Sequence, residues 1–367
     1  MSLKKKILSA ATAAVVSVPL ILGAPPAAEA IDLGKIGSIA EVIISGEQAK
    51  TQMRAAIKQL NETKAGQDAV FQNTVKDAGV DNNPIYTQRL DRIMANLTKG
   101  VAAVDPTIND LPYKYFVAAD DSLNAFCTVG HVMAVNRGTF NILATEDEIA
   151  AVVGHEMGHG QKNHSVKSCE KQVDQQVAAG LLNAALGGDV LTSKLTEIAL
   201  KHRGAHKDKK FETEADLLSI DYLVNTPYNI GATAAVMQKF VELENGAKKS
   251  QLQVLFNPSD HPGSDKRRDA CAKKVSEYSG NHATAKDGVV SVNKKVFVKP
   301  AAAGNLSAAG RSYFVLGNLA RAYHNGENKK PATVQNGTVM LGNQPIITPV
   351  EGDEDAQTLA DRLNSIK

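Results

Sequence analysis

Residues 152–164, VVGHEMGHGQKNH, constrain this chain more than any other stretch, because three histidines and a glutamate stand within one helical pattern. Thr145 is followed three residues later by Glu148, a capping-box signature for the start of a helix. Apolar residues at 149, 152 and 153 continue the helical spacing into the quoted stretch. The sequence therefore predicts a capped helix with one polar face and one apolar face.

His155 and His159 are four residues apart, so on a helix they lie about 40° apart around the axis and one turn apart along it. Both imidazoles can therefore reach one tetrahedral Zn2+ ion. Glu156 can reach a metal-bound water molecule and accept its proton. H-E-x-x-H on a helix is typical of metalloproteases. The alternative is a polar helix face without metal, and the cap and the apolar opposite face favour zinc.

His164 is a tempting third ligand, but it stands nine residues after His155, about 900° of helical rotation. That rotation predicts the opposite side of the same helix. The metzincin pattern would need Gly at 162 and His at 165, where this chain has Lys162 and Ser165. We therefore expect His164 to lie on the helix surface or to support a metal ligand from behind.

A third ligand must then come from elsewhere, and two Glu-x-x-x-Asp patterns follow, beginning at Glu170 and Glu212. Glu170 is eleven residues after His159, a rise of roughly 16 Å if the helix continues. Glu212 lies on a later predicted helix, where it shares a face with Asp216 while Glu214 is turned about 200° away. A second carboxylate four residues on can orient a ligating histidine. The alternative is a solvated acidic face beside the preceding basic run.

Charge and cysteine content narrow the function classes. The 41 basic and 39 acidic residues leave a net charge of +2, and the chain has no Trp, so we do not expect a nucleic acid partner. The three cysteines fit no zinc-ribbon spacing, and we expect buried or free thiols. They are Cys127, Cys169 and Cys271.

Residues 1–30 have the pattern of a signal peptide. Three lysines at 4–6 precede a mostly apolar run over 7–23, and Ala28-Glu29-Ala30 predicts cleavage before Ile31. The apolar run is marginal for spanning a bilayer, so a retained anchor is the alternative. No later stretch approaches membrane length. We therefore expect an exported, soluble protein of the periplasm or cell envelope.

The rest of the chain predicts an α+β fold in two parts. Residues 31–280 are mainly helical, with strands predicted at 113–118 and 131–136. Residues 281–367 combine short strand-like runs with two helices, and we expect a small separate α+β domain. No internal repeat is apparent.

Four segments give the chain a family resemblance: NAFCTVGHVMAVNRGTF, TEDEIAAVVGHEMGHGQKNHS, FETEAD and DHPGSDKR. In this order they resemble the HtpX/BepA/Oma-type zinc endopeptidases, the family that also holds the CaaX prenyl proteases. The resemblance covers residues 90–276 and implies a zincin-type domain with a small active-site sheet, one Zn2+ ion and a polypeptide substrate. The chain lacks the transmembrane helices of the HtpX and prenyl-protease branches and is similar to the exported branch. Its C-terminal region does not resemble the helical-repeat tail of BepA, so the partner of that region is unknown.

The resemblance also implies residue roles. Zinc is held by His155, His159 and Glu212, with Glu156 as general base. The resemblance implies a catalytic histidine near the metal at His261 and an arginine that follows it at Arg267. It also implies that the carboxylate of Asp216 supports a metal ligand from behind. The strand at 131–136 is implied to be an active-site edge strand that holds an extended peptide by β-augmentation. Its substrate-binding residues are Val132, Met133 and Ala134.

The expected activity is zinc-assisted hydrolysis of peptide bonds in envelope or misfolded proteins. A second class stays open. The protein could be an envelope chaperone or assembly factor whose zinc is structural or latched, with His261 as a fourth ligand, because structural zinc sites are closed by four protein ligands.

Overall fold

A computed structural model describes residues 46–143, 145–178, 208–246 and 263–367. The fold is α+β, as predicted, with helices stacked around three small sheets. The predicted signal peptide and His261 lie outside the described residues. The helices are α1 (Gly46–Glu62), α2 (Lys64–Ala78), α3 (Pro84–Ala102), α4 (Arg137–Ile142), α5 (Glu146–Gln161), α6 (His164–Ala178), α8 (Lys209–Leu223), α9 (Ala232–Gly246), α11 (Ser264–Tyr278), α12 (Ala308–His324) and α13 (Ala356–Ile366).

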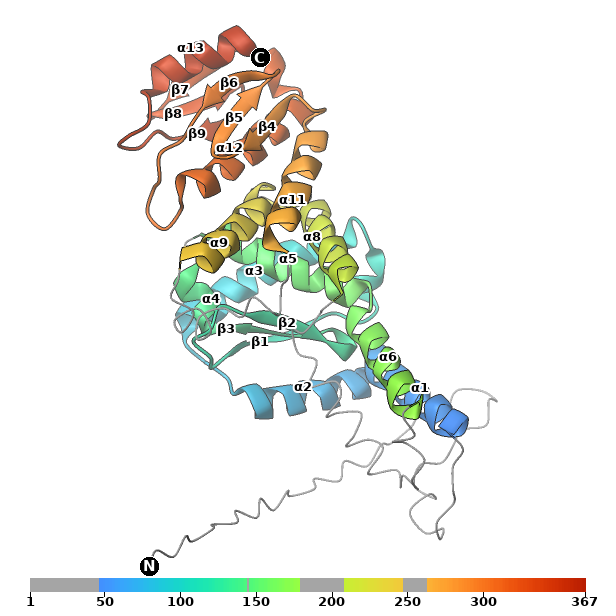
Figure 1. The fold of residues 1–367 in the computed structure, drawn as a ribbon. Coiled ribbons are helices and arrows are strands. Elements are labelled where there is room, and N and C mark those ends of the chain that lie inside the picture. Colours follow the sequence, from blue (N-terminus) through green and yellow to red (C-terminus); the bar gives the residue numbers. More distant parts are fainter. Residues whose placement is uncertain (1–45, 144, 179–207, 247–262) are drawn as a thin grey trace, which may run out of the picture.

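The first sheet has the strand order β1-β3-β2. It consists of β1 (Lys114–Ala118), β2 (Ala125–Thr128) and β3 (Val132–Asn136). β3 pairs with β1 in parallel and with β2 in antiparallel. α2 covers one face, and α3 and α5 lie on the other (Figure 1).

The predicted edge strand is therefore the central strand, and that prediction is wrong. All five residues of β3 are buried, and Val132, Met133 and Ala134 are 0% exposed. A continuous apolar run is typical of a strand covered on both faces. Because β1 and β2 occupy both of its hydrogen-bonding edges, these three residues have no free edge for a peptide substrate. The edge strand beside α5 is β2 instead.

The capping box predicted at the start of α5 is present. The side chain of Thr145 accepts a hydrogen bond from the amide of Glu148 at 3.1 Å, and Oε2 of Glu148 accepts one from the amide of Thr145 at 3.0 Å. These bonds satisfy two backbone donors at the helix start. From there α5 runs through the molecule between α3 and α8, and most of its residues are buried.

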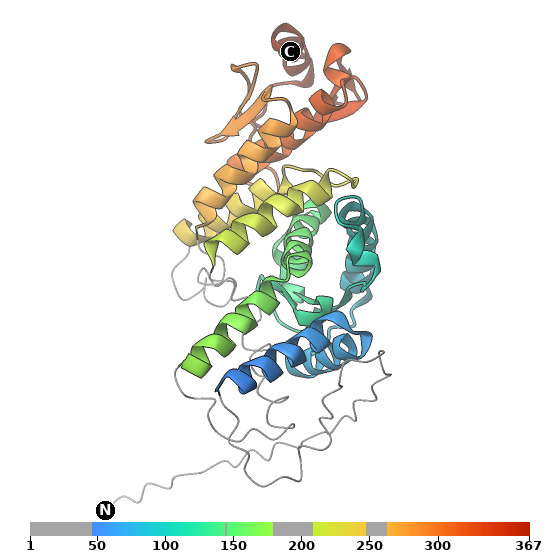
Figure 2. The same ribbon diagram turned by 90° about the vertical axis from the view of Figure 1, so that its right-hand side faces the viewer.

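The helices α1 and α6 lie side by side and project from the body (Figures 1 and 2). Apolar side chains, including Met53 and Val173, pack between them. Asp174 of α6 forms ion pairs at 3.0 Å with Lys50 and Arg54 of α1.

The region after α11 contains an internal repeat, which the sequence analysis missed. Two three-stranded antiparallel meanders are each followed by a helix, and each strand of the second begins 49 residues after its counterpart. The strands are β4 (Ala283–Lys286), β5 (Val289–Val292), β6 (Lys295–Val298), β7 (Ala332–Gln335), β8 (Thr338–Leu341) and β9 (Gln344–Ile347).

The two copies share turn chemistry more than sequence identity. The first hairpin of the first copy turns on Asp287-Gly288, and the first hairpin of the second copy turns on Asn336-Gly337. All four of these residues have positive φ. Such pairs are the preferred residues of type I′ turns, whose twist matches that of the strands. Each middle strand also carries a register shift at the equivalent place, after Val290 and after Val339.

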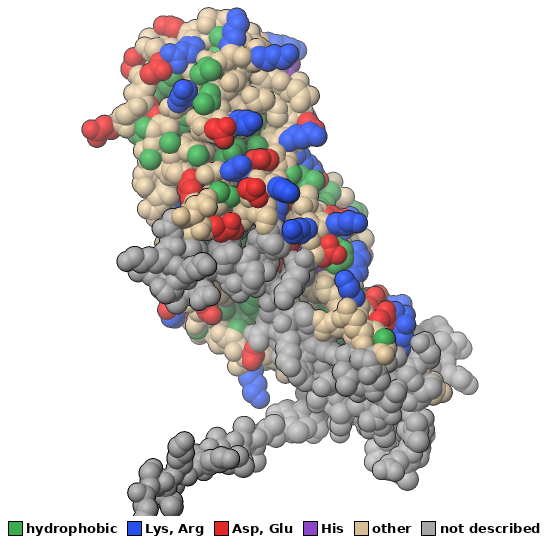
Figure 3. Space-filling view, viewed as in Figure 1, with side chains coloured by type: hydrophobic (Ala, Val, Ile, Leu, Met, Phe, Trp, Pro, Cys, Tyr) green, Lys and Arg blue, Asp and Glu red, His purple; other side chains and the backbone are tan. Residues whose placement is uncertain are grey.

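The two parts of the chain share one continuous core. It extends from α3 and α5 through α9 and α12 into the C-terminal sheets. On the face seen in Figure 3, acidic and basic side chains are interspersed over the C-terminal part. No helix in the described ranges is long and apolar enough to cross a membrane. The three cysteines are free and buried, as expected.

Candidate metal centre and active site

The site forms where α5 and α8 pack closely together. A Cβ atom added at Gly158 would lie 3.1 Å from the Cα of Ala215, and one added at Gly154 would lie 3.0 Å from Oγ of Ser219. Because these two glycines lack side chains, the backbone of α8 can pack directly against this face of α5. This approach brings Glu212 of α8 to the two histidines of α5.

His155, His159 and Glu212 offer two nitrogens and one oxygen, all within 4.8 Å of one another and all buried. Nε2 of His155 lies 3.0 Å from Nε2 of His159. Oε1 of Glu212 lies 3.3 Å from Nε2 of His159, and Oε2 lies 3.8 Å from Nε2 of His155. Ligands at 2.0–2.1 Å from zinc in tetrahedral geometry are roughly 3.3 Å apart. The donor set therefore fits one Zn2+ ion held by three protein ligands, the number found in catalytic sites.

Asp216 and Arg267 support this cluster from behind. Asp216 contacts Nδ1 of His155 at 2.8 Å and accepts two hydrogen bonds from Arg267, at 2.6 and 2.8 Å. Nη1 of Arg267 also lies 2.8 Å from Oε2 of Glu212. Burial alone would raise the pKa of Asp216, but the charge of Arg267 and hydrogen bonds from Arg267 and His155 hold it below its usual value. A charged carboxylate thus fixes the ring of His155.

Glu156 lies beside the cluster and is held by the edge strand. Its Oε2 accepts a hydrogen bond of 2.9 Å from the amide of Cys127 in β2, and its Oε1 lies 3.9 Å from Nε2 of His155. Burial, followed by the charge of Glu212, raises the pKa of Glu156 well above its usual value.

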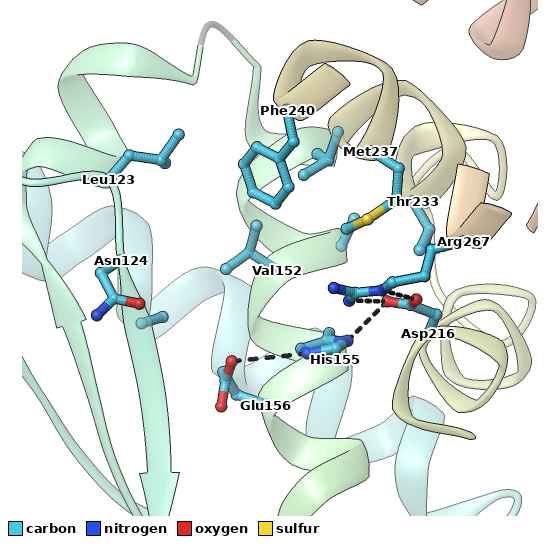
Figure 4. A pocket seen from close by; sticks show the side chains of 13 residues that line it. Leu123, Asn124, Val152, His155, Glu156, Asp216, Thr233, Met237, Phe240 and Arg267 are labelled. Carbon is cyan, nitrogen blue, oxygen red and sulfur yellow. Dashed lines mark hydrogen bonds and ion pairs between the residues drawn. The ribbon is translucent and has the colours of Figure 1, made fainter. Parts of the chain in front are cut away.

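An apolar pocket opens next to His155 and Glu156 (Figure 4). Side chains from α5 and α9 form one wall, and the segment leading into β2 forms the other. The apolar lining side chains include Leu123, Val152, Met237 and Phe240.

The structure places His164 next to the metal ligand His159 and Glu214 next to His164, although neither was predicted to be a ligand from the sequence. α5 ends at Gln161, and a new helix begins at His164, which is buried and contacts His159. Of the two positions expected for His164, support of a ligand is therefore correct and the helix surface is wrong. Glu214 contacts His164 at 3.1 Å. Asn163, with φ of 53°, is the local signal for the break, because asparagine adopts left-handed conformations more readily than most residues.

Two histidines on one buried helix, a glutamate from a second helix and a glutamate poised beside them define a zinc metalloprotease of the H-E-x-x-H class. The comparison with known families agrees. The model of peptidase family M48 matches residues 84–275, slightly more than half of the chain, and the chain belongs to this family. The predicted family is thus confirmed, and so are the predicted enzyme class and the Zn2+ cofactor.

Named relatives show how far the similarity extends. The metalloprotease LoiP of Escherichia coli is 28% identical over 60% of this chain and 81% of its own length. A putative beta-barrel assembly-enhancing protease of Vibrio cholerae is 28% identical over 52% of this chain and 40% of its own. The mitochondrial metalloendopeptidase OMA1 of Arabidopsis thaliana is 22% identical over 58% of this chain and 41% of its own. The chain thus spans less than half the length of the last two.

Proposed function

We propose that this metalloprotease cleaves envelope or misfolded polypeptides with Glu156 as the general base. The observation that carries the proposal is the buried carboxylate of Glu156, fixed by the amide of Cys127 beside His155. A Zn2+ ion held by His155, His159 and Glu212 would supply a Lewis acid for the scissile carbonyl and would lower the pKa of a water molecule. Glu156 would then accept a proton from the attacking water and later pass it to the leaving amine.

The position of the edge strand β2 beside Glu156 supports the binding of an extended peptide substrate. The amide of Cys127 points away from β3 and towards Glu156, so the outer edge of β2 faces the site. Ala125, two residues earlier, has its backbone groups on the same side. We infer that a peptide pairs with β2 at Ala125 by β-augmentation and places an apolar side chain in the neighbouring pocket. Segments that are extended and apolar are what a misfolded protein exposes.

The test of the general base is Glu156→Gln. The variant is expected to keep stoichiometric zinc, because Glu156 is not a ligand, and to lose roughly 10²–10⁴-fold in the cleavage rate of casein, the usual contribution of a placed base. Glu170→Gln, on α6, is the matched control and is expected to cleave at the parent rate. Undiminished cleavage by zinc-loaded Glu156→Gln would remove this residue from the mechanism. A parent protein that binds zinc but does not cleave would favour the chaperone class.

Export is the second part of the proposal. It rests on the lysines, the apolar run and the Ala28-Glu29-Ala30 site of residues 1–30. The mature chain is expected to begin at or near Ile31, which the intact mass of the protein from its native host would test. Recovery of the full-length chain with membranes would indicate a retained anchor instead.

A further inference from the structure

The ring of His164 lies beside the metal centre because α5 ends before this residue and a new helix, α6, begins at it. α5 ends at Gln161, and Asn163 takes a left-handed conformation with φ of 53°. His164 then starts α6 with 0% of its surface exposed. Its Nδ1 lies 2.8 Å from Nδ1 of His159.

The ligand geometry sets the direction of this hydrogen bond. Nε2 of His159 faces the other two ligand residues, His155 and Glu212, and must offer its lone pair to the metal. The proton of neutral His159 therefore sits on Nδ1, which donates to Nδ1 of His164. The remaining proton of His164 sits on Nε2, which donates to Oε2 of Glu214 at 3.1 Å. The result is a chain of two imidazoles that ends at a half-exposed carboxylate.

The two zinc-binding histidines are thus supported in different ways. Nδ1 of His155 contacts the buried carboxylate of Asp216 directly. His159 instead contacts a second imidazole, which stacks on Phe211 with the ring centroids 4.1 Å apart and the planes within 10°. This packing holds the ring of His164 in place, and Glu214 fixes which of its nitrogens is the acceptor.

We propose that His164 is a positioning residue for zinc: it accepts the Nδ1 proton of His159 and so keeps Nε2 of that ligand aimed at the metal, with Glu214 fixing the tautomer of His164. The proposal deepens the proposed function and rests on the zinc site that this function uses. Partners that orient a metal-ligating histidine usually contribute about 10–100-fold to metal affinity.

The experiment compares His164→Phe with His164→Asn in zinc titrations of the full chain against a competing chelator. Phe keeps a ring on Phe211 but removes the acceptor, so zinc affinity is expected to fall by about 10–100-fold. Asn carries an oxygen close to the place of Nδ1, so its affinity is expected to stay near that of the parent. Glu214→Ala is expected to cause a smaller loss than His164→Phe. His282→Phe, a change far from the site, is the control with unchanged affinity.

Thermal unfolding with and without zinc separates positioning from a structural role. A purely structural histidine would lower the melting temperature of both forms equally, whereas a positioning residue reduces the increase that zinc produces. Equal zinc affinity of His164→Phe and the parent would overturn the proposal, and so would an Asn variant as weak as the Phe variant. If His164→Phe does not fold, the zinc affinity of Glu214→Ala, a change at a half-exposed side chain, tests the proposal instead. A zinc affinity of Glu214→Ala equal to that of the parent would then refute the proposal. None of these readouts uses cleavage, so they stand apart from the test of Glu156.

Discussion

Glu212 and Asp216 lie one helical turn apart on α8, and their neighbours give them different tasks. Glu212 places an oxygen 3.3 Å from Nε2 of His159, on the side where the ligand atoms converge. Asp216 contacts Nδ1 of His155, on the far side of that ring, and is held there by Arg267. The first carboxylate can bond to the metal, whereas the second can only orient a residue that does.

This difference predicts an order of zinc affinities. Glu212→Gln is expected to weaken zinc binding strongly, because a neutral amide replaces a charged ligand. Asp216→Asn is expected to cost about 10–100-fold, the size typical of groups behind a ligand. Glu170→Gln is expected to have no effect. The same chelator competition would measure the zinc affinity of all three variants. A larger loss of affinity in Glu170→Gln than in Glu212→Gln would contradict the ligand assignment.

At this scale the sequence predicts contacts that depend on local geometry. The spacing of His155 and His159 suffices to place both imidazoles on one side, because four residues make about one helical turn. The same arithmetic fails for His164, since it assumes a helix that continues through Asn163. Where a helix ends depends on the tertiary packing around it, and spacing contains no information about that packing.

At the scale of elements, the site depends on how closely α5 and α8 approach each other. Gly154 and Gly158 lie on the face of α5 that packs against α8, and neither has a side chain to separate the two helices. A Cβ atom at Gly158 would lie 3.1 Å from the backbone of Ala215. The glycines of the motif thus have a packing role besides the metal chemistry of its histidines. The sequence pattern places Glu212 on a later helix, but the spacing of the motif does not indicate this packing role for the glycines.

The strands show what sequence pattern can and cannot predict. The strands predicted at 113–118 and 131–136 are confirmed as β1 and β3, each of which begins one residue later than predicted. The order of the strands does not follow from these patterns, because pairing joins segments that only the tertiary fold brings together. The four-residue strand β2, AFCT, was not predicted, yet it supplies the edge and the amide that holds Glu156.

At the scale of the whole molecule, the C-terminal repeat is attached to the protease region through backbone contacts. A Cβ atom at Gly231 would lie 1.9 Å from the carbonyl oxygen of Tyr313, and one at Gly317 would lie 2.5 Å from the amide nitrogen of Gly231. Asn229 donates to the carbonyl of Phe314 at 3.0 Å. Together with the continuous core, these contacts favour coupled folding of residues 281–367 and the region before them.

The separate-domain prediction for residues 281–367 can therefore be tested against a coupled fold. A coupled chain is expected to unfold in one calorimetric transition whose enthalpy equals the van't Hoff enthalpy. Gly317→Leu inserts a side chain where α12 touches the backbone of Gly231, and such overpacking costs roughly 1–3 kcal/mol or more. This variant is expected to melt at a lower temperature and to separate the transition into two steps.

The matched control is Gly310→Ala on the same helix, where the added Cβ would meet only Oγ of Ser307, at 3.2 Å. Alanine has a higher helix propensity than glycine, which offsets the close contact with Ser307, so this variant is expected to melt in one step near the parent temperature. Zinc stoichiometry should stay at one in both variants below their transitions, because neither change touches α5 or α8. Two well-separated transitions in the parent protein would contradict the coupling and support an independently folding C-terminal domain.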